Sequence, residues 1–240
     1  MLGRNADSNG TTLVLVAHGT RSRHGIDMIS ALAAEVRRHV HDVRVAFVDV
    51  IGPSPVDVLR DCGDDAVLVP AFLASGYHVY TDVPRDVEES GHETVAVTRA
   101  LGPDPVLAGV VARRLRSAGW LPGDTVVMAV AGSSDRRARQ DARKASAMLS
   151  EVIGQRVHLA NVATGTPKVA DVVAALRTQG HRRVFIASYL LAHGLFQQRL
   201  HDAGADGVAD PIGPHEDVAA LIVARYLSGC RELARRVRSA

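Results

Sequence analysis

The chain of 240 residues is poor in cysteine and in aromatic side chains. Its two cysteines, Cys62 and Cys230, lie far apart in the sequence, so they cannot build a disulfide framework or a cysteine-based zinc site. Aromatic residues make up 4% of the chain and the net charge is only +2, so neither base stacking nor a basic surface indicates a nucleic-acid partner. We therefore expect no nucleic-acid binding.

Long apolar runs are missing as well. No stretch reaches the roughly 18 to 20 apolar residues that a membrane-spanning helix needs, and residues 1–9 lack the apolar core of a signal peptide. We therefore expect no membrane association and a cytoplasmic location. The composition that remains is typical of a folded globule, with 47% hydrophobic and 22% charged residues and a mean hydropathy of +0.06.

Short apolar, β-branched runs alternate with segments of helical spacing. The sequence predicts strands at 12–17, 43–50, 66–71 and 94–98, and helices at 26–40, 56–62, from about 84, and at 105–118. The first run, TLVLVA, is apolar on both faces, as in a strand covered by helices on either side of a sheet. This alternation favours an α/β fold with a parallel sheet and right-handed crossovers.

The same order of segments then starts again, at offsets between 111 and 118 residues. The matching segments are 12–20 with 125–133, 45–53 with 159–167, 72–76 with 190–194, and 101–103 with 212–214. Four anchors in the same order indicate an internal duplication. We expect two similar α/β domains, residues 1–120 and 121–240, each a short parallel sheet flanked by helices, with a pseudo-twofold relation between them.

The two copies differ where the chemistry of a site would lie. His18, Asp49 and His78 of the first copy correspond to Ala131, Ala163 and Phe196 of the second. All three first-copy residues fall at or just after predicted strand ends, where parallel α/β sheets bind ligands. Two imidazoles and a carboxylate suit a divalent cation such as Fe²⁺, Co²⁺, Ni²⁺ or Zn²⁺. The sequence therefore predicts a metal site of His18, His78 and Asp49 in the first copy alone.

Each of these residues also has an ordinary structural interpretation. The chain contains 11 histidines, and a histidine in a loop is more often solvated or capping than catalytic. Asp49 is equally compatible with a helix cap or a solvated acid at a strand end. His193 corresponds to Ser75 rather than to His78, so we do not predict it as a ligand.

Several strings together resemble one known family. They are LVLVAHGTR at 13–21, FVDVIGPSP at 47–55, VPAFLASGYHVYTDVP at 69–84 and LGPDP at 101–105. The first half of the chain resembles the class II tetrapyrrole chelatases, specifically the sirohydrochlorin chelatases that insert iron or cobalt. The second half is similar to the degenerate C-terminal repeat of the two-copy members of that family.

The resemblance implies a role for each matching residue. The family's two metal-site histidines fall on His18 and His78, and its acidic residue falls on Asp49, which is one methylene shorter than the more usual Glu. The family's histidine in the Gly-Pro turn is Asp104 here, and His215 stands at the matching place in the second copy. We assign neither of these a catalytic role.

The implied reaction inserts a divalent metal, Fe²⁺ or Co²⁺ with Ni²⁺ also compatible, into sirohydrochlorin and releases two pyrrole protons. The metal is then a substrate, and no organic cofactor is implied. Neutral imidazoles suit this chemistry because they bind the cation and accept protons near neutral pH. The substrate is an octacarboxylate, so Arg21, Arg23 and Arg85 are candidate carboxylate partners. The internal duplication makes a monomer the expected state.

Two alternatives differ from this reading. A histidine phosphatase or mutase also carries His-Gly after its first strand, but Ala17 stands where the arginine of that motif belongs. A non-catalytic carrier of metal or tetrapyrrole would use the same cleft, and the sequence leaves it open. A turnover measurement distinguishes the two, because a carrier binds at most one equivalent whereas a chelatase forms metallated product in excess over protein.

Overall fold

The computed structural model describes residues 10–63 and 65–239. Residues 1–9, on which the expectation about a signal peptide rests, lie outside this part of the chain. The first copy contains β1 (Thr12–Ala17), α1 (Arg23–Val36), β2 (Val43–Phe47), α2 (Pro55–Arg60), β3 (Ala66–Pro70), π-helix η1 (His78–Asp82), α3 (Val83–Ser90), β4 (Val95–Val97) and α4 (Pro105–Ser117). The second contains β5 (Thr125–Gly132), α5 (Arg136–Ile153), β6 (Val157–Thr164), α6 (Val169–Thr178), β7 (Val184–Tyr189), α7 (Leu195–His201), β8 (Gly207–Val208) and α8 (Glu216–Ser239).

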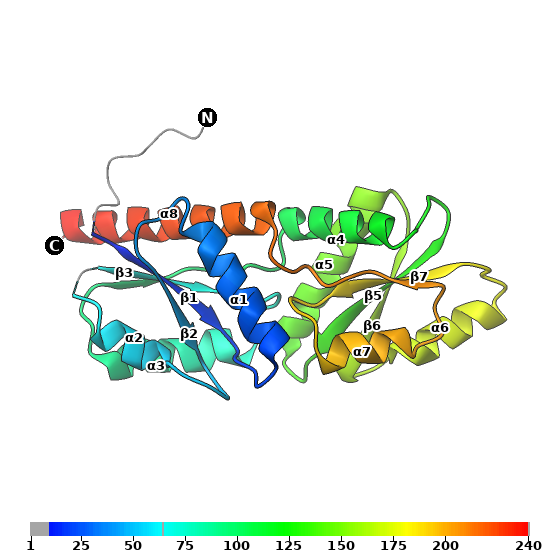
Figure 1. The fold of residues 1–240 in the computed structure, drawn as a ribbon, viewed down its shortest axis with the longest axis horizontal. Coiled ribbons are helices and arrows are strands. Elements are labelled where there is room, and N and C mark those ends of the chain that lie inside the picture. Colours follow the sequence, from blue (N-terminus) through cyan, green and yellow to red (C-terminus); the bar gives the residue numbers. More distant parts are fainter. Residues whose placement is uncertain (1–9, 64, 240) are drawn as a thin grey trace.

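Two four-stranded parallel sheets lie side by side along the long axis of the molecule (Figure 1). Their strand orders, β2-β1-β3-β4 and β6-β5-β7-β8, are equivalent. Strand β1 lies inside its sheet, where Leu15 pairs with Val45 on one side and Val69 on the other. This position explains why every residue of β1 is buried and why the run is apolar on both faces. The predicted α/β class with two similar sheets is confirmed.

The helix that follows β3 begins earlier than the sequence predicts. The prediction starts it near Pro84, but the chain is already helical at His78, in one turn of π-helix that leads into α3. The backbone N–H groups of Val79 and Tyr80 both donate to the Gly76 carbonyl and start this turn. Single π turns inside helices are frequent at functional sites. His78 is therefore part of the helical segment, and the prediction that this helix begins near Pro84 is wrong.

The last helix of each copy packs on the sheet of the other copy. Helix α4 packs against α5 and β7, whereas α8 lies over α1, β3 and β4 (Figure 1). Gly229 of α8 lies so close to Val67 of β3 that a Cβ at this glycine would overlap the valine side chain. The division of the chain near residue 120 remains a prediction, and in the structure the last helix of each copy packs on the sheet of the other copy.

A buried ion pair joins the exchanged helices. Arg225 of α8 donates to the Asp104 carboxylate at 2.7 Å, and both residues are only 8% exposed. Asp104 also caps α4 by accepting a hydrogen bond from the Val106 N–H at 3.0 Å. One hydrophobic cluster, which includes Leu15 and Met128, runs continuously through both copies. The two copies are therefore packed as one structural unit. In the described ranges no helix is both long and apolar enough to cross a membrane.

Candidate active site

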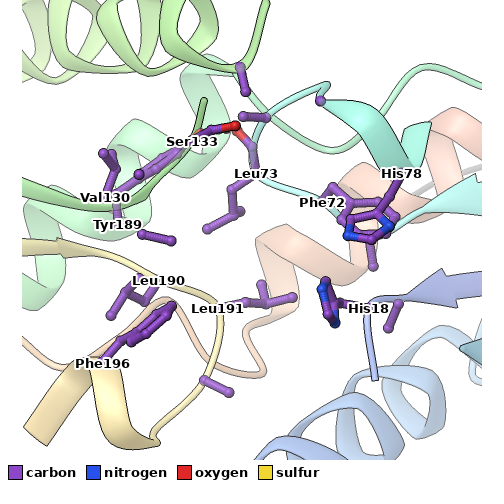
Figure 2. Close-up of a pocket in the computed structure, with 18 of the residues that line it drawn as sticks. His18, Phe72, Leu73, His78, Val130, Ser133, Tyr189, Leu190, Leu191 and Phe196 are labelled. Atoms are coloured by element: carbon purple, nitrogen blue, oxygen red, sulfur yellow. Dashed lines mark hydrogen bonds between the residues drawn. The ribbon is translucent and has the colours of Figure 1, made fainter. Parts of the chain in front are cut away.

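A cleft of about 540 Å³ lies between the two copies, at the carboxyl ends of β1, β3, β5 and β7. Both copies line it, mainly with apolar side chains such as Phe72, Val130 and Leu191 (Figure 2). Small-molecule sites commonly occupy about 300–1,000 Å³, are mostly apolar, and lie beyond the carboxyl ends of parallel strands. The position and size of the cleft are those of a small-molecule site.

His18 directly follows the last residue of β1 and lines the cleft. The next residue, Gly19, has a positive φ of 88°, and a Cβ there would overlap the carbonyl oxygen of Asp49. The His18 carbonyl also accepts a hydrogen bond from the Asp49 N–H at 3.1 Å. Glycine is thus required because the backbone after β1 approaches the backbone of the loop after β2 closely.

His78 lies beside His18, as the sequence predicts. The two ring centroids are 4.5 Å apart and the rings are nearly perpendicular, at 80° (Figure 2). The His78 ring is also stacked on Phe72, with centroids 5.9 Å apart and an angle of 13°. The structure therefore brings together two imidazoles from different elements of the first copy. Their role as metal ligands remains a prediction.

Asp82 is the site residue that sequence reasoning missed. Its Oδ2 lies 2.6 Å from Nδ1 of His78, and the carboxylate is buried. An ionised carboxylate only accepts hydrogen bonds, so Nδ1 carries the proton and Nε2 keeps its lone pair for a metal or a proton. The sequence does show that Asp82 follows His78 by four residues. This spacing brings the two side chains together only if the segment is already helical at His78.

Arg85 is bound to two carboxylates of its own helix region. It contacts Asp82 at 3.2 Å and Asp86 at 3.0 Å. Burial raises the pKa of the Asp86 carboxyl, while Arg85 acts in the opposite direction. Arg85 does not line the cleft. In this structure Asp82 and Asp86 occupy its guanidinium, and its role toward substrate carboxylates remains a prediction.

Arg21 and Arg23 are exposed and also do not line the cleft. Both lie where the chain leaves β1 and enters α1, and α1 presents Gly25, Met28 and Ile29 to the cleft instead. The structure therefore provides no contact between these two arginines and the site.

Asp49 does not join the two histidines. Strand β2 ends at Phe47, so Asp49 lies in the following loop, is exposed and does not line the cleft. Its Oδ1 accepts a hydrogen bond from the Val50 N–H at 2.7 Å, while Val50 adopts a positive φ of 69°. Within residues 10–63 and 65–239, no group of three His, Cys, Asp or Glu side chains is arranged to hold a metal. The predicted three-residue site is thus not formed.

The second copy holds the loop that leads to His78. The Tyr189 hydroxyl donates to the Leu73 carbonyl at 3.2 Å, and burial raises the pKa of this tyrosine, which keeps the donor proton in place. The Ser75 N–H donates to the buried Asp141 carboxylate at 3.0 Å. Arg137 lies over the ring of Tyr80, 4.5 Å from its centroid. The second copy therefore fixes the position of His78 although it lacks the histidines.

The second-copy positions that correspond to the two histidines also form part of the cleft. Ala131 and Phe196 line it, and Phe196 lies across the cleft from the two imidazoles (Figure 2). Ala163 does not line it, and its carbonyl accepts a hydrogen bond from Lys168. The sequence difference between the two copies is thus also a difference between the two sides of the cleft.

The remaining candidates lie outside the cleft lining. Asp104 is the buried helix cap described above, and Nδ1 of His215 accepts a hydrogen bond from the Asp217 N–H at 3.1 Å. His193 lies 3.8 Å from the Asp210 carboxylate and does not line the cleft. These contacts give Asp104 and His215 structural roles at the start of helices.

Arg139 of α5 lines the cleft and is not among the site residues predicted from the sequence. Its counterpart in the first copy, at the offset of the strands before the two helices, is Ile26. The sequence alone shows that an apolar residue near the start of a helix in the first copy corresponds to a charged residue in the second copy. This difference was the only indication of a role for Arg139 that the sequence offered.

The fold and the cleft define a class of protein: a duplicated parallel α/β chain with an interdomain site whose imidazoles come from one copy only. The model of the CbiX family matches residues 12–118 and again residues 125–228. The chain therefore belongs to the CbiX family, and it contains two copies of the family unit.

Individual relatives agree with this assignment. A sirohydrochlorin cobaltochelatase from Methanothermobacter thermautotrophicus is 27% identical over 130 residues, which are 44% of this chain and 91% of the relative. The structure of SirB from Bacillus subtilis with Fe³⁺ has a TM-score of 0.77 at 20% identity, over 95% of this chain and 97% of the other. Sirohydrochlorin chelatase SirB from Bacillus subtilis subspecies spizizenii, in complex with cobalt, has a TM-score of 0.75 at 19% identity and covers the same shares of the two chains. At these identities the two structures show a shared fold.

Proposed function

We propose that this protein inserts a divalent metal, Fe²⁺ or Co²⁺, into sirohydrochlorin and releases two pyrrole protons. The observation that carries the proposal is the pair of imidazoles, His18 and His78, with centroids 4.5 Å apart in a largely apolar cleft. Membership of the CbiX family and similarity to a sirohydrochlorin cobaltochelatase support this substrate. The SirB structures with Fe³⁺ and with cobalt support both metals.

The metal enters this reaction as a substrate and must leave with the product. Two imidazoles bind a divalent cation and leave most of its coordination positions to water and to the incoming pyrrole nitrogens. A closed four-ligand site would retain the metal instead. The absence of Asp49 from the cleft lining is consistent with an open site.

The two pyrrole protons need acceptors close to the metal. A neutral imidazole can bind the metal or accept a proton, and His78 is oriented for either by the Asp82 carboxylate at Nδ1. A carboxylate 2.6 Å from Nδ1 is also a favourable partner for a protonated ring. Each turnover consumes one cation and one free-base macrocycle and yields the metallated macrocycle and two protons.

The walls of the cleft suit a flat macrocycle. They are formed by side chains such as Phe72, Leu73, Leu191 and Phe196, with few polar groups among them (Figure 2). Burial of the apolar faces of a tetrapyrrole against these walls supplies the non-directional part of binding. Since both copies supply the walls, we also propose that a single chain is the functional unit, which light scattering after gel filtration tests.

Turnover tests the proposal directly. Sirohydrochlorin is incubated under anaerobic conditions with the protein and Fe²⁺, Co²⁺ or Ni²⁺, and the absorbance change of metallation is followed at several protein concentrations. A chelatase forms metallated product in large excess over protein, and the His78→Ala variant loses most of this rate. A yield that stops at one equivalent identifies a carrier and overturns the proposal.

A further inference from the structure

Within the described part of the chain, the cleft lining contains a single permanent charge. Among the described residues that line it there is no Asp, Glu or Lys, and one Arg, Arg139. The other titratable side chains in the lining are the two imidazoles and the phenols of Tyr77 and Tyr189. No carboxylate of the lining offsets the guanidinium. Arg139 is itself exposed, so an anion that enters the cleft meets one fixed positive charge whose attraction is partly screened by water.

The Arg139 side chain has no partner within residues 10–63 and 65–239. Its neighbours on α5 are engaged: Arg137 lies over Tyr80, and Lys144 contacts the Asp141 carboxylate at 3.2 Å. Arg139 has no hydrogen bond, ion pair or ring contact with this part of the chain. Its five N–H donors are therefore available to a ligand.

Two other polar side chains that the second copy contributes to the lining donate to the chain itself. The Tyr189 hydroxyl donates to Leu73, and the Asn161 amide donates to the Pro167 carbonyl at 3.2 Å. The corresponding position to Arg139 in the first copy is Ile26, which does not line the cleft. The first copy thus supplies imidazoles, and the second supplies a free guanidinium.

We propose that Arg139 binds a peripheral carboxylate of the macrocycle and so orients the ring between the two copies, with its centre toward His18 and His78. This inference rests on the proposed function and names a specificity residue in its site. The planar guanidinium matches a carboxylate in a two-bond arrangement, which an ammonium group does not reproduce. The first copy then supplies the imidazoles, and the second copy supplies the group that recognises the substrate's charge.

The test measures binding of metal-free sirohydrochlorin, without any metal, by its absorbance or fluorescence. Arg139→Ala is compared with the matched control Arg143→Ala, an exposed arginine one turn further along α5 that does not line the cleft. We expect Arg139→Ala to raise the dissociation constant about 10-fold to 100-fold, the range for loss of a hydrogen bond to a charged group. Arg143→Ala should change it less than about twofold, and Arg139→Lys should restore binding only in part.

The octamethyl ester of sirohydrochlorin separates charge recognition from packing. The ester keeps the ring but has no carboxylate, so wild type and Arg139→Ala should bind it with equal affinity. If Arg139→Ala weakens both ligands alike, or weakens neither, the inference about Arg139 is wrong. If the wild-type protein binds neither ligand, the proposed function itself fails. In every variant, metal binding measured without macrocycle should be unchanged.

Discussion

The contact between Asp82 and His78 allows a quantitative prediction. In the Asp82→Asn variant the shape of the side chain is kept, but the negative charge beside Nδ1 is lost, and the amide no longer favours one tautomer of the ring. The contact is 2.6 Å long and the carboxylate is buried, so it belongs to the stronger class of charge-assisted hydrogen bonds. Such bonds contribute about 1.5–3 kcal/mol, equivalent to roughly 10-fold to 150-fold in an equilibrium constant.

Two independent considerations agree on this magnitude. Mutation of a group that orients a metal-binding histidine usually reduces metal affinity or activity by about 10-fold to 100-fold. We therefore expect Asp82→Asn to raise the metal concentration needed for half-maximal turnover by about 10-fold to 100-fold. The affinity for metal-free sirohydrochlorin should stay within about twofold, because Asp82 does not line the cleft.

The assay is the initial rate of metallation as a function of Co²⁺ concentration at saturating sirohydrochlorin, with a parallel Co²⁺ titration in the absence of macrocycle. Arg85→Gln is the matched control, because it removes a cation that is 57% exposed but leaves the contact between Asp82 and His78 in place. Its effect on metal dependence should be much smaller. An Asp82→Asn variant with wild-type metal dependence would refute the reasoning. If Asp82→Asn instead weakened metal binding, macrocycle binding and thermal stability together, the role of the Asp82 carboxylate would be structural only.

Three further predictions address the asymmetry, the acid dependence and the stability of the molecule. Phe196→His should leave turnover almost unchanged, whereas His78→Ala should abolish most of it, and the opposite pattern in the same metallation assay would move the site to the second copy. Activity should fall on acidification because protons compete with a divalent metal for its ligands, so a pH–rate profile at higher metal concentration should have its acid limb at lower pH. An acid limb that does not depend on metal concentration would argue against competition between protons and metal. Asp104→Ala leaves Arg225 buried without its carboxylate partner and should reduce the free energy of unfolding by about 3–5 kcal/mol in urea denaturation. The metal dependence of the folded protein should stay unchanged. A loss below about 1 kcal/mol would show that the ion pair contributes little to stability.

Local patterns in the sequence were sufficient to predict the architecture of the fold. Burial on both faces of a parallel sheet requires continuous apolar, β-branched runs, so Thr12–Ala17 could be recognised as an inner strand without coordinates. The duplication was visible because equivalent strands, turns and glycines recur at nearly constant offsets. His18 and His78 could be placed at one edge of the sheet because the carboxyl ends of parallel strands lie on the same side.

Only the tertiary structure decided which side chains meet. Asp82 reaches His78 because the chain forms one π turn there, and the pattern of apolar residues contains no signal for that turn. Asp49 turns away because β2 ends two residues earlier and its carboxylate binds the backbone of the next residue. The exchange of α4 and α8 and the position of Arg139 depend on packing between segments about a hundred residues apart. Periodicity along the chain reports which face of an element is buried, whereas the partner of that face and the direction of each polar side chain are set by long-range packing.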